Sequence, residues 1–190
     1  MVLMEELRIV LASSASDRRR FAAFVRYHVR RRYGGTPRPS QILLFAERKG
    51  RICGTIALDF ADDQTRFPLE AIYQLDSDPP PFFREETAQF GKWWATRPGA
   101  SIRLMHTAHV FALSHGKRFG IAEAKPKIAS YVARLGMSLQ EVPGAILLAE
   151  AGLARGEGYY RMPPPPRLYM FNLTENLAAL SNYMEDAKGS

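Results

Sequence analysis

The sequence predicts an α/β domain built on a mixed sheet with helices on both faces. Segments with the alternation of a strand and segments with the period of a helix follow one another along the chain, which indicates a sheet covered by helices. Two strand segments lie on either side of the charged turn Arg48–Arg51 and so predict a hairpin. Apolar residues make up 46% of the 190 residues, enough for a buried core and more than a disordered chain carries. We expect a sheet of six or seven strands.

The predicted elements divide the chain into one domain at 1–170 and a helical tail at 171–190. A strand near the start leads into a helix that Ser or Asp residues cap and that stops near Arg32, before a Gly and Pro segment. Another helix, at 125–136, ends at Gly136. The remaining elements are the hairpin at 41–63, helical or extended residues at 66–83, strands at 85–96, 120–126, 145–152 and 167–173, and helices at 100–120 and 173–186.

Three features of the sequence bear on the compartment in which the protein works. No apolar run approaches the roughly 18 residues that a membrane-spanning helix needs. The start of the chain carries glutamates where a signal peptide would carry lysines. The single cysteine, Cys53, has no partner for an internal disulfide, which is usual in a reducing compartment. We therefore expect a cytoplasmic protein.

Positive charge is concentrated in one segment of a chain whose net charge is +7. Seven arginines lie between Arg18 and Arg32, with Asp17 as the single acid beside them. Such a field favours an acidic partner, which would be nucleic acid, an anionic membrane surface or an acidic protein. The alternative is a solvated helix face, because Phe21 and Val25 keep helical spacing beneath the arginines.

Three segments carry a resemblance to a known group of enzymes. The first is "FPLEAIYQLD" at 67–76, and the second is "ETAQF" at 86–90. The third combines "SYVARLGM" at 130–137 with "GEGYYRMPPPPRLY" at 156–169. In this order they resemble the GNAT-fold acyltransferases, in particular the autoinducer synthases, the N-acyl amino acid synthases and the thermostable haemolysins.

The resemblance implies a GNAT-like sheet and an N-acyltransferase. Its acyl group would come from a thioester of an acyl carrier protein or of CoA and would go to an amine such as an amino acid. On the resemblance, Glu86 accepts the proton of the attacking amine, and Gly91 allows a bulge that exposes a backbone N–H. The other implied contacts, to the acyl chain and the pantetheine arm, are Phe90, Trp93, Trp94, Thr96, Arg97, Gly99 and Ala100.

The segment "TRPGASI" at 96–102 bears on the acyl donor, because acetyl-CoA enzymes of this group hold a pyrophosphate at this point with a glycine-rich loop. This chain has one glycine there, Gly99, and Pro98 removes one of the N–H groups that such a loop needs. Phosphopantetheine on a carrier protein needs less of that loop. Carrier proteins are acidic, so we assign the arginines Arg19, Arg26 and Arg30 to docking one, and nucleic acid becomes the disfavoured partner.

Other interpretations stay open. Gln89 stands where autoinducer synthases have arginine, which weakens the case for homoserine-lactone production. Glu85 and Glu86 would also suit a solvated strand start, and the two tryptophans would also suit the core. The domain could instead be a small-molecule acetyltransferase that uses acetyl-CoA, or a basic binding module without chemistry.

The co-substrate is therefore expected to be acyl-phosphopantetheine or acyl-CoA, without a metal. His106 and His109 are spaced to share a metal ion, but no third ligand stands near them in the sequence, and zinc sites need three or four. The sequence leaves open whether the tail helix packs on its own domain or on a second copy of the chain, as in a homodimer.

Overall fold

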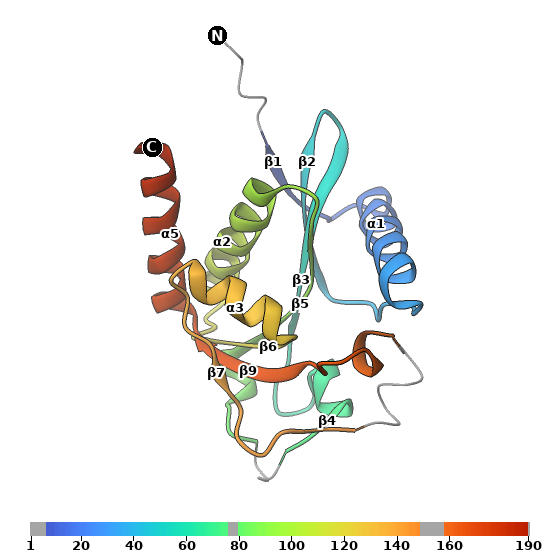
Figure 1. The fold of residues 1–190 in the computed structure, drawn as a ribbon, viewed down its shortest axis with the longest axis vertical. Coiled ribbons are helices and arrows are strands. Elements are labelled where there is room, and N and C mark those ends of the chain that lie inside the picture. Colours follow the sequence, from blue (N-terminus) through green and yellow to red (C-terminus); the bar gives the residue numbers. More distant parts are fainter. Residues whose placement is uncertain (1–6, 76–79, 149–157, 190) are drawn as a thin grey trace.

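The computed structural model describes residues 7–75, 80–148 and 158–189, and its main feature is a mixed sheet of seven strands (Figure 1). In spatial order the strands are β1 (Arg8–Leu11), β2 (Ile42–Arg48), β3 (Arg51–Phe60), β5 (Thr87–Ala95), β6 (Phe119–Ala124), β9 (Arg167–Asn172) and β7 (Gln140–Glu141). Neighbours run antiparallel except for the central pair, β5 and β6, which is parallel. The predicted mixed sheet is confirmed.

Helices cover both faces of the sheet, as predicted (Figure 1). One face carries α1 (Ala15–Tyr33), and the other carries α2 (Pro98–Ser114), α3 (Pro126–Arg134) and α5 (Leu173–Gly189). Smaller elements lie near one end of the sheet: the 3-10 turns η1 (Pro68–Ala71) and η2 (Arg84–Glu86), the strand pair β4 (Tyr73–Gln74) and β8 (Ile146–Leu147), and a helical turn at 158–161. Across the described ranges, no helix is both long and apolar enough to cross a membrane.

Each face of the sheet packs its own core, because side chains alternate between the two faces of a strand. On β3, Ala57 packs with Phe21 and Val25 of α1. Its neighbours Ile56 and Leu58 belong to the core shared with α2, α3 and α5. Burial of apolar surface on both faces therefore fixes the helices on the sheet.

The C-terminal helix α5 packs on its own domain. Leu173 and Leu180 are fully buried in the core that includes α2. Asn176 accepts a hydrogen bond from the Ser138 N–H at 2.8 Å and donates one to the Ser138 carbonyl at 3.0 Å. These contacts attach the helix to the chain that carries it.

Two predicted strands differ from the structure. The strand expected at 85–96 starts at Thr87, because Glu85 and Glu86 belong to the turn η2, where the Glu86 N–H donates to the Phe83 carbonyl at 3.1 Å. The expected start of that strand is therefore wrong. Of the strand predicted at 145–152, only β8 forms within the described part, and 149–152 lies outside the described residues. The sequence did not predict β7, since two residues show no alternation.

The central strands β5 and β6 pair along only part of their length. Thr87 to Phe90 pair with Phe119 to Ala122, and the ladder ends there. Beyond that point β5 continues to Ala95 along β3, while β6 continues to Ala124 along β9. The two strands therefore part after Phe90 and Ala122.

A β-bulge follows the point of parting. β5 carries two residues, Lys92 and Trp93, where β3 has one, Ile56. Lys92 has a φ of 51°, in the left-handed region that residues other than glycine seldom adopt. Thr55 Oγ1 stabilises this conformation by donating to the Lys92 carbonyl at 2.9 Å. The bulge was predicted at Gly91, one residue earlier, where a side-chain Cβ would meet no atom within 4 Å.

Gly120 provides a test of this packing. It lies directly opposite Phe171 on β9, and a Cβ at position 120 would stand 2.2 Å from the Phe171 ring. That ring is buried between Phe90 and His109 and has little room to move. We expect Gly120→Ala to lower the free energy of unfolding by about 1–3 kcal/mol, measured by urea titration. Gly99→Ala, where a Cβ meets open space, should change it by less than about 0.5 kcal/mol, and an equal loss in both variants would contradict the packing argument.

Candidate active site

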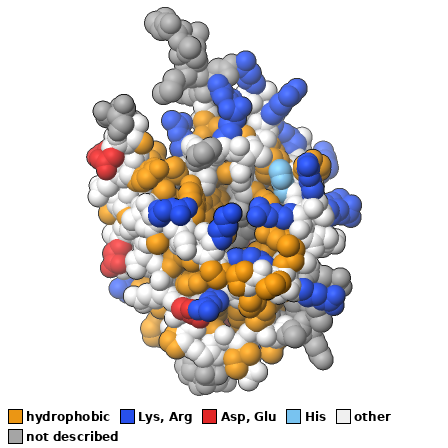
Figure 2. Space-filling model, in the orientation of Figure 1, with side chains coloured by type: hydrophobic (Ala, Val, Ile, Leu, Met, Phe, Trp, Pro, Cys, Tyr) orange, Lys and Arg blue, Asp and Glu red, His pale blue; other side chains and the backbone are white. Residues whose placement is uncertain are grey.

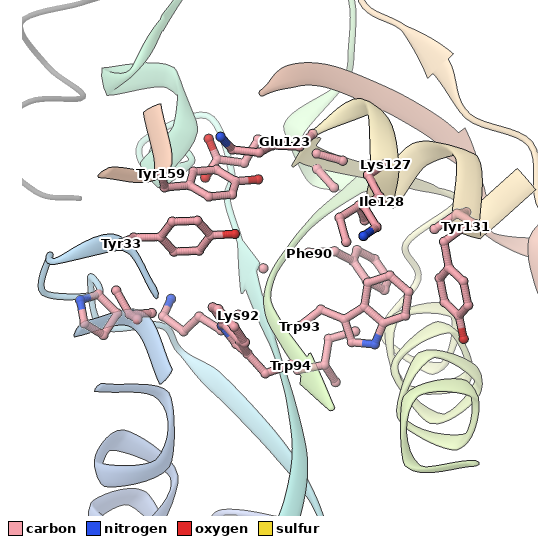
Figure 3. Close-up of a pocket in the computed structure, with 18 of the residues that line it drawn as sticks. Tyr33, Phe90, Lys92, Trp93, Trp94, Glu123, Lys127, Ile128, Tyr131 and Tyr159 are labelled. Atoms are coloured by element: carbon pink, nitrogen blue, oxygen red, sulfur yellow. The ribbon is translucent and has the colours of Figure 1, made fainter. Parts of the chain in front are cut away.

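A cavity of about 800 Å³ opens where β5 and β6 part (Figure 3). Its walls come from the unpaired part of β5, the end of β6, α3, the C-terminal end of α1, η1 and the residues at 159–164. The volume lies within the range of roughly 300–1,000 Å³ that is usual for sites of small molecules.

Most of the residues that the resemblance implied as donor contacts line this cavity: Phe90, Gly91, Trp93, Trp94, Thr96 and Arg97. Thr96 is held by its N–H and its hydroxyl, which both donate to the Cys53 carbonyl, at 2.9 and 3.1 Å. Gly99 and Ala100 are not among the lining residues. Ala100 is buried beside Gly54, and Gly99 lies in the first turn of α2.

One side of the cavity is apolar. Figure 3 shows Phe90, Trp93, Ile128 and Tyr131 on this side, with the Tyr131 ring 5.8 Å from the Trp93 ring. Behind them the lining is Met105, Val132, Met137, Leu139 and Phe171. An alkyl chain in this space would bury its surface against carbon atoms.

The opposite side holds a buried carboxyl group, Glu123, near the end of β6 (Figure 3). The Tyr160 hydroxyl donates to its Oε1 at 2.8 Å. Its Oε2 and the Tyr73 hydroxyl are also buried, and this hydroxyl lies close enough to Glu123 to interact with the carboxyl group. Burial raises the pKa of Glu123 to about 7, although the Tyr160 hydrogen bond lowers it in part. Such a carboxyl group exchanges its proton near neutral pH.

Sequence reasoning missed Glu123, although a signal was present. The segment "FGIAEA" places one acid inside an apolar strand. An acid that is buried in this way often has a shifted pKa and marks a functional site. What the sequence does not show is that Tyr73 and Tyr160, which lie far away along the chain, surround the same carboxylate.

Glu86 lies away from the cavity, at the start of the β5–β6 pair. Its carboxylate forms an ion pair with Arg118 at 3.1 Å, and its carbonyl accepts the Arg118 N–H at 2.7 Å. Gly91, the first residue beyond the paired part of β5, is five residues further on, which is about 16 Å along a strand. Glu86 is not among the described residues that line the cavity.

The tyrosines Tyr33 and Tyr159 close the polar side of the cavity. Their rings meet edge to face with centroids 5.1 Å apart, and the Lys125 ammonium lies 5.3 Å from the Tyr159 ring. A Cβ on Gly158 would stand 2.1 Å from the Tyr33 carbonyl oxygen. Glycine at position 158 therefore allows the turn at 158–161 to lie against the end of α1.

Positive charge surrounds this site. The cationic side chains that line the cavity are Arg32, Arg38, Lys92, Arg97, Lys125 and Lys127, whereas Glu123 is the only acid among the described lining residues. Figure 2 shows lysine and arginine side chains gathered over the middle of this face and few acids. A ligand with a negative group is therefore favoured at the opening.

The arginines of α1 divide into two groups. Arg20 is engaged within the domain, since it pairs with Glu47 at 2.7 Å and with Asp17 at 3.4 Å. By contrast, Arg19, Arg26 and Arg30 are exposed and form no ion pair with any described residue. Their spacing of seven and four residues places them on one side of the helix.

The histidines His106 and His109 lie outside the cavity. His109 is buried between Phe90 and Phe171, and burial lowers its pKa to about 4. His106 faces the Ser181 hydroxyl at 3.4 Å. In the part of the chain that the structure describes, no three acidic, histidine or cysteine side chains form a metal-binding group.

The hydrogen bond from Tyr160 to Glu123 can be tested by removing the hydroxyl. Because that bond stabilises the carboxylate, Tyr160→Phe should raise the pKa of Glu123 above about 7. The measurement is a carbon-13 NMR titration of the Glu123 carboxyl group. Tyr131→Phe, on the apolar side of the same cavity, is the control and should leave this pKa unchanged. A Glu123 pKa that falls in Tyr160→Phe would contradict the assigned geometry.

Comparison with known proteins shows the fold. No protein-family model and no curated protein sequence matches the chain. Among solved structures, an apo form of TofI is 15% identical with a TM-score of 0.67, over 92% of this chain and 96% of that one. FeeM, an N-acyl amino acid synthase from uncultured soil microbes, is 12% identical with a TM-score of 0.61, over 93% and 95% of the two chains. The acyl-homoserine lactone (AHL) synthase LasI is 9% identical with a TM-score of 0.64, over 94% and 96%. The chain therefore has the α/β fold of these acyl-transferring proteins along nearly its whole length, as the sequence resemblance implied.

Proposed function

We propose that the protein is an N-acyltransferase that moves an acyl group from a thioester to an amine, with Glu123 as the proton acceptor. The observation that carries this proposal is the cavity between the parted strands, which joins an apolar side to a carboxyl group with a pKa of about 7. The shared fold with AHL synthases and an N-acyl amino acid synthase supports it.

The chemistry needs few parts, because a thiolate is already a good leaving group. An amine arrives largely as ammonium and must lose a proton before its nitrogen attacks the thioester carbonyl carbon. Glu123 can accept that proton. The new carbon–nitrogen bond forms, the carbonyl oxygen becomes an oxyanion, and the carbon–sulfur bond then breaks to release the thiolate. In this proposal, a backbone N–H near the bulge at Lys92 and Trp93 stabilises the oxyanion.

The unpaired edge of β5 supports the binding of a pantetheine arm. Beyond Phe90, β5 has no partner on the β6 side, so an extended amide-containing arm can pair with it as an added strand. An acyl chain would then enter the apolar side beside Phe90 and Trp93. A binding module without chemistry would need neither this parting nor this cavity.

The start of α2 supports a carrier protein rather than CoA as the donor. Pro98 has no N–H, and the N–H groups of Ala100 and Ser101 already donate to the Arg97 carbonyl, at 3.2 and 3.3 Å. Few free N–H groups are therefore left to hold a pyrophosphate. We propose that acyl-phosphopantetheine arrives on an acidic carrier protein that docks on Arg19, Arg26 and Arg30.

Glu123 and Glu86 can be separated as proton acceptors by matched amide substitutions. Glu123→Gln should lower acyl transfer by about 10²–10⁴-fold, the usual contribution of a positioned base. Glu86→Gln, which changes only the Arg118 ion pair, should lower it less than about threefold, because a surface ion pair contributes little. The assay follows thiol release from a decanoyl thioester of N-acetylcysteamine with a panel of amines. The reverse order of effects would return the role to Glu86.

The same carboxyl group predicts a pH dependence with a definite sign. Only the carboxylate accepts a proton, so the wild-type rate should rise with pH and level off above about 7. Glu123→Gln should show no such plateau, because its rate follows the fraction of free amine alone. The folded protein keeps a proton that the unfolded chain releases near the ordinary value of 4.5, so stability should fall from about pH 4.5 to about pH 7. A wild-type rate that is flat over this range would remove Glu123 from the proposed role.

The carrier-protein proposal predicts a charge-dependent difference between donors. Replacing Arg19, Arg26 and Arg30 with Glu should slow transfer from an acyl carrier protein by at least about tenfold, because electrostatic steering is lost. Transfer from the N-acetylcysteamine thioester should change little. With the wild type, the carrier-protein rate should fall as salt rises, since the screening length is about 10 Å at 0.1 M. Equal losses with both donors would assign the arginines to a solvated surface.

A further inference from the structure

Lys92 is a charged side chain at a position where β5 would ordinarily continue as a regular strand. The bulge and the φ of 51° turn the strand at this residue. Lys92 lines the cavity, and Figure 3 shows it on the side that holds Tyr33, Tyr159 and Glu123. A conformation that costs free energy at a lysine calls for a compensating role.

A hydrogen-bond chain holds the Lys92 ammonium in this place. The ammonium donates to the Ser40 hydroxyl, and that hydroxyl donates to Asp59 Oδ2 at 2.8 Å. Asp59 is buried, and its other oxygen accepts the Gln41 N–H at 2.9 Å. Burial lowers the pKa of Lys92, while the charge of Asp59 opposes that shift and favours the ammonium.

The Lys92 ammonium has further N–H groups that can donate hydrogen bonds toward the cavity. A lysine carries three N–H donors, and the described structure assigns one of them, to Ser40. Arg38 lines the same cavity and repels Lys92, whereas Glu123 attracts it. An anion bound between Lys92 and Arg38 would stabilise both cations. Glu123 is close enough to Lys92 for their charges to interact, so one small acceptor could place its ammonium group at Glu123 and an anionic group at Lys92.

We propose that Lys92 determines acceptor specificity by binding a carboxylate of the acceptor, so that the substrate is an amine that also carries a carboxylate. This inference rests on the proposed function. The acceptor would lie with its amine toward Glu123 and its carboxylate toward Lys92. An amine that lacks the carboxylate would give the Lys92 ammonium no anionic partner. The transition state for acylation of that amine would therefore be less stabilised.

The test compares acceptors that differ only in charge. L-Leucine and L-leucinamide are offered with the decanoyl thioester of N-acetylcysteamine, and kcat/KM is measured for each. At neutral pH more of the amide is unprotonated, so intrinsic reactivity favours the amide. We expect wild type nevertheless to prefer leucine by about 10- to 100-fold, the range for a charge-assisted hydrogen bond.

Lys92→Met keeps the length of the side chain and removes its charge, and it should lower the preference to within about threefold, whereas Lys92→Arg should retain part of it. Lys117→Met is the control, because Lys117 is a buried lysine that does not line the cavity, whereas Lys92 is half-buried and does. This variant should keep the wild-type preference.

Three results would overturn the inference. The first is a wild-type enzyme that acylates leucinamide as well as leucine. This result needs no variant, so it counts even where Lys92→Met does not fold. A Lys92→Met enzyme that keeps the full preference would show that the lysine only supports the bulge. Absence of transfer to every amine tested would overturn the proposed function, and this inference with it.

Discussion

The backbone hydrogen bonds that β5 and β6 do not make determine the form of the site. Each strand stays paired with its outer neighbour, β3 or β9, while the central ladder stops after Phe90 and Ala122. Backbone N–H and C=O groups need partners when they are shielded from bulk water. The free edge of β5 therefore provides donors and acceptors in a fixed line, and the space beside it is the cavity described above.

Local features of β5 and β6 lie close to the point where the strands part. The bulge at Lys92 turns β5, and Thr55 satisfies the carbonyl that the turn exposes. Within the paired part of β6, opposite Ala88, Gly120 allows the Phe171 ring to pack directly against the strand. Beyond the point of parting, β5 stays paired with β3 and β6 stays paired with β9, so within the described sheet each strand keeps a hydrogen-bonded neighbour on its outer side.

Much of the fold was predictable because its signals are local. The capped arginine-rich helix, the hairpin around Lys49 and Gly50, and the apolar period of α2 each show in a short window of sequence. The site was less predictable. Trp93 and Trp94 were placed at the cavity by resemblance, but Glu123 acquires its pKa from burial and from Tyr160, a contact between distant segments. Such a property belongs to the tertiary structure, and no local pattern contains it.

The close approach of Gly158 to Tyr33 has a consequence for how the protein acquires its activity during folding. This contact joins the end of the first helix to a turn close to the last strand. It therefore closes one of the longest loops in the chain. Closing a long loop costs conformational entropy before any contact stabilises it. The hairpin and the helices can form from nearer partners. A refolding chain would therefore recover its circular dichroism before Tyr159 and Tyr160 reach Glu123, and the last step of folding would be the one that completes the site.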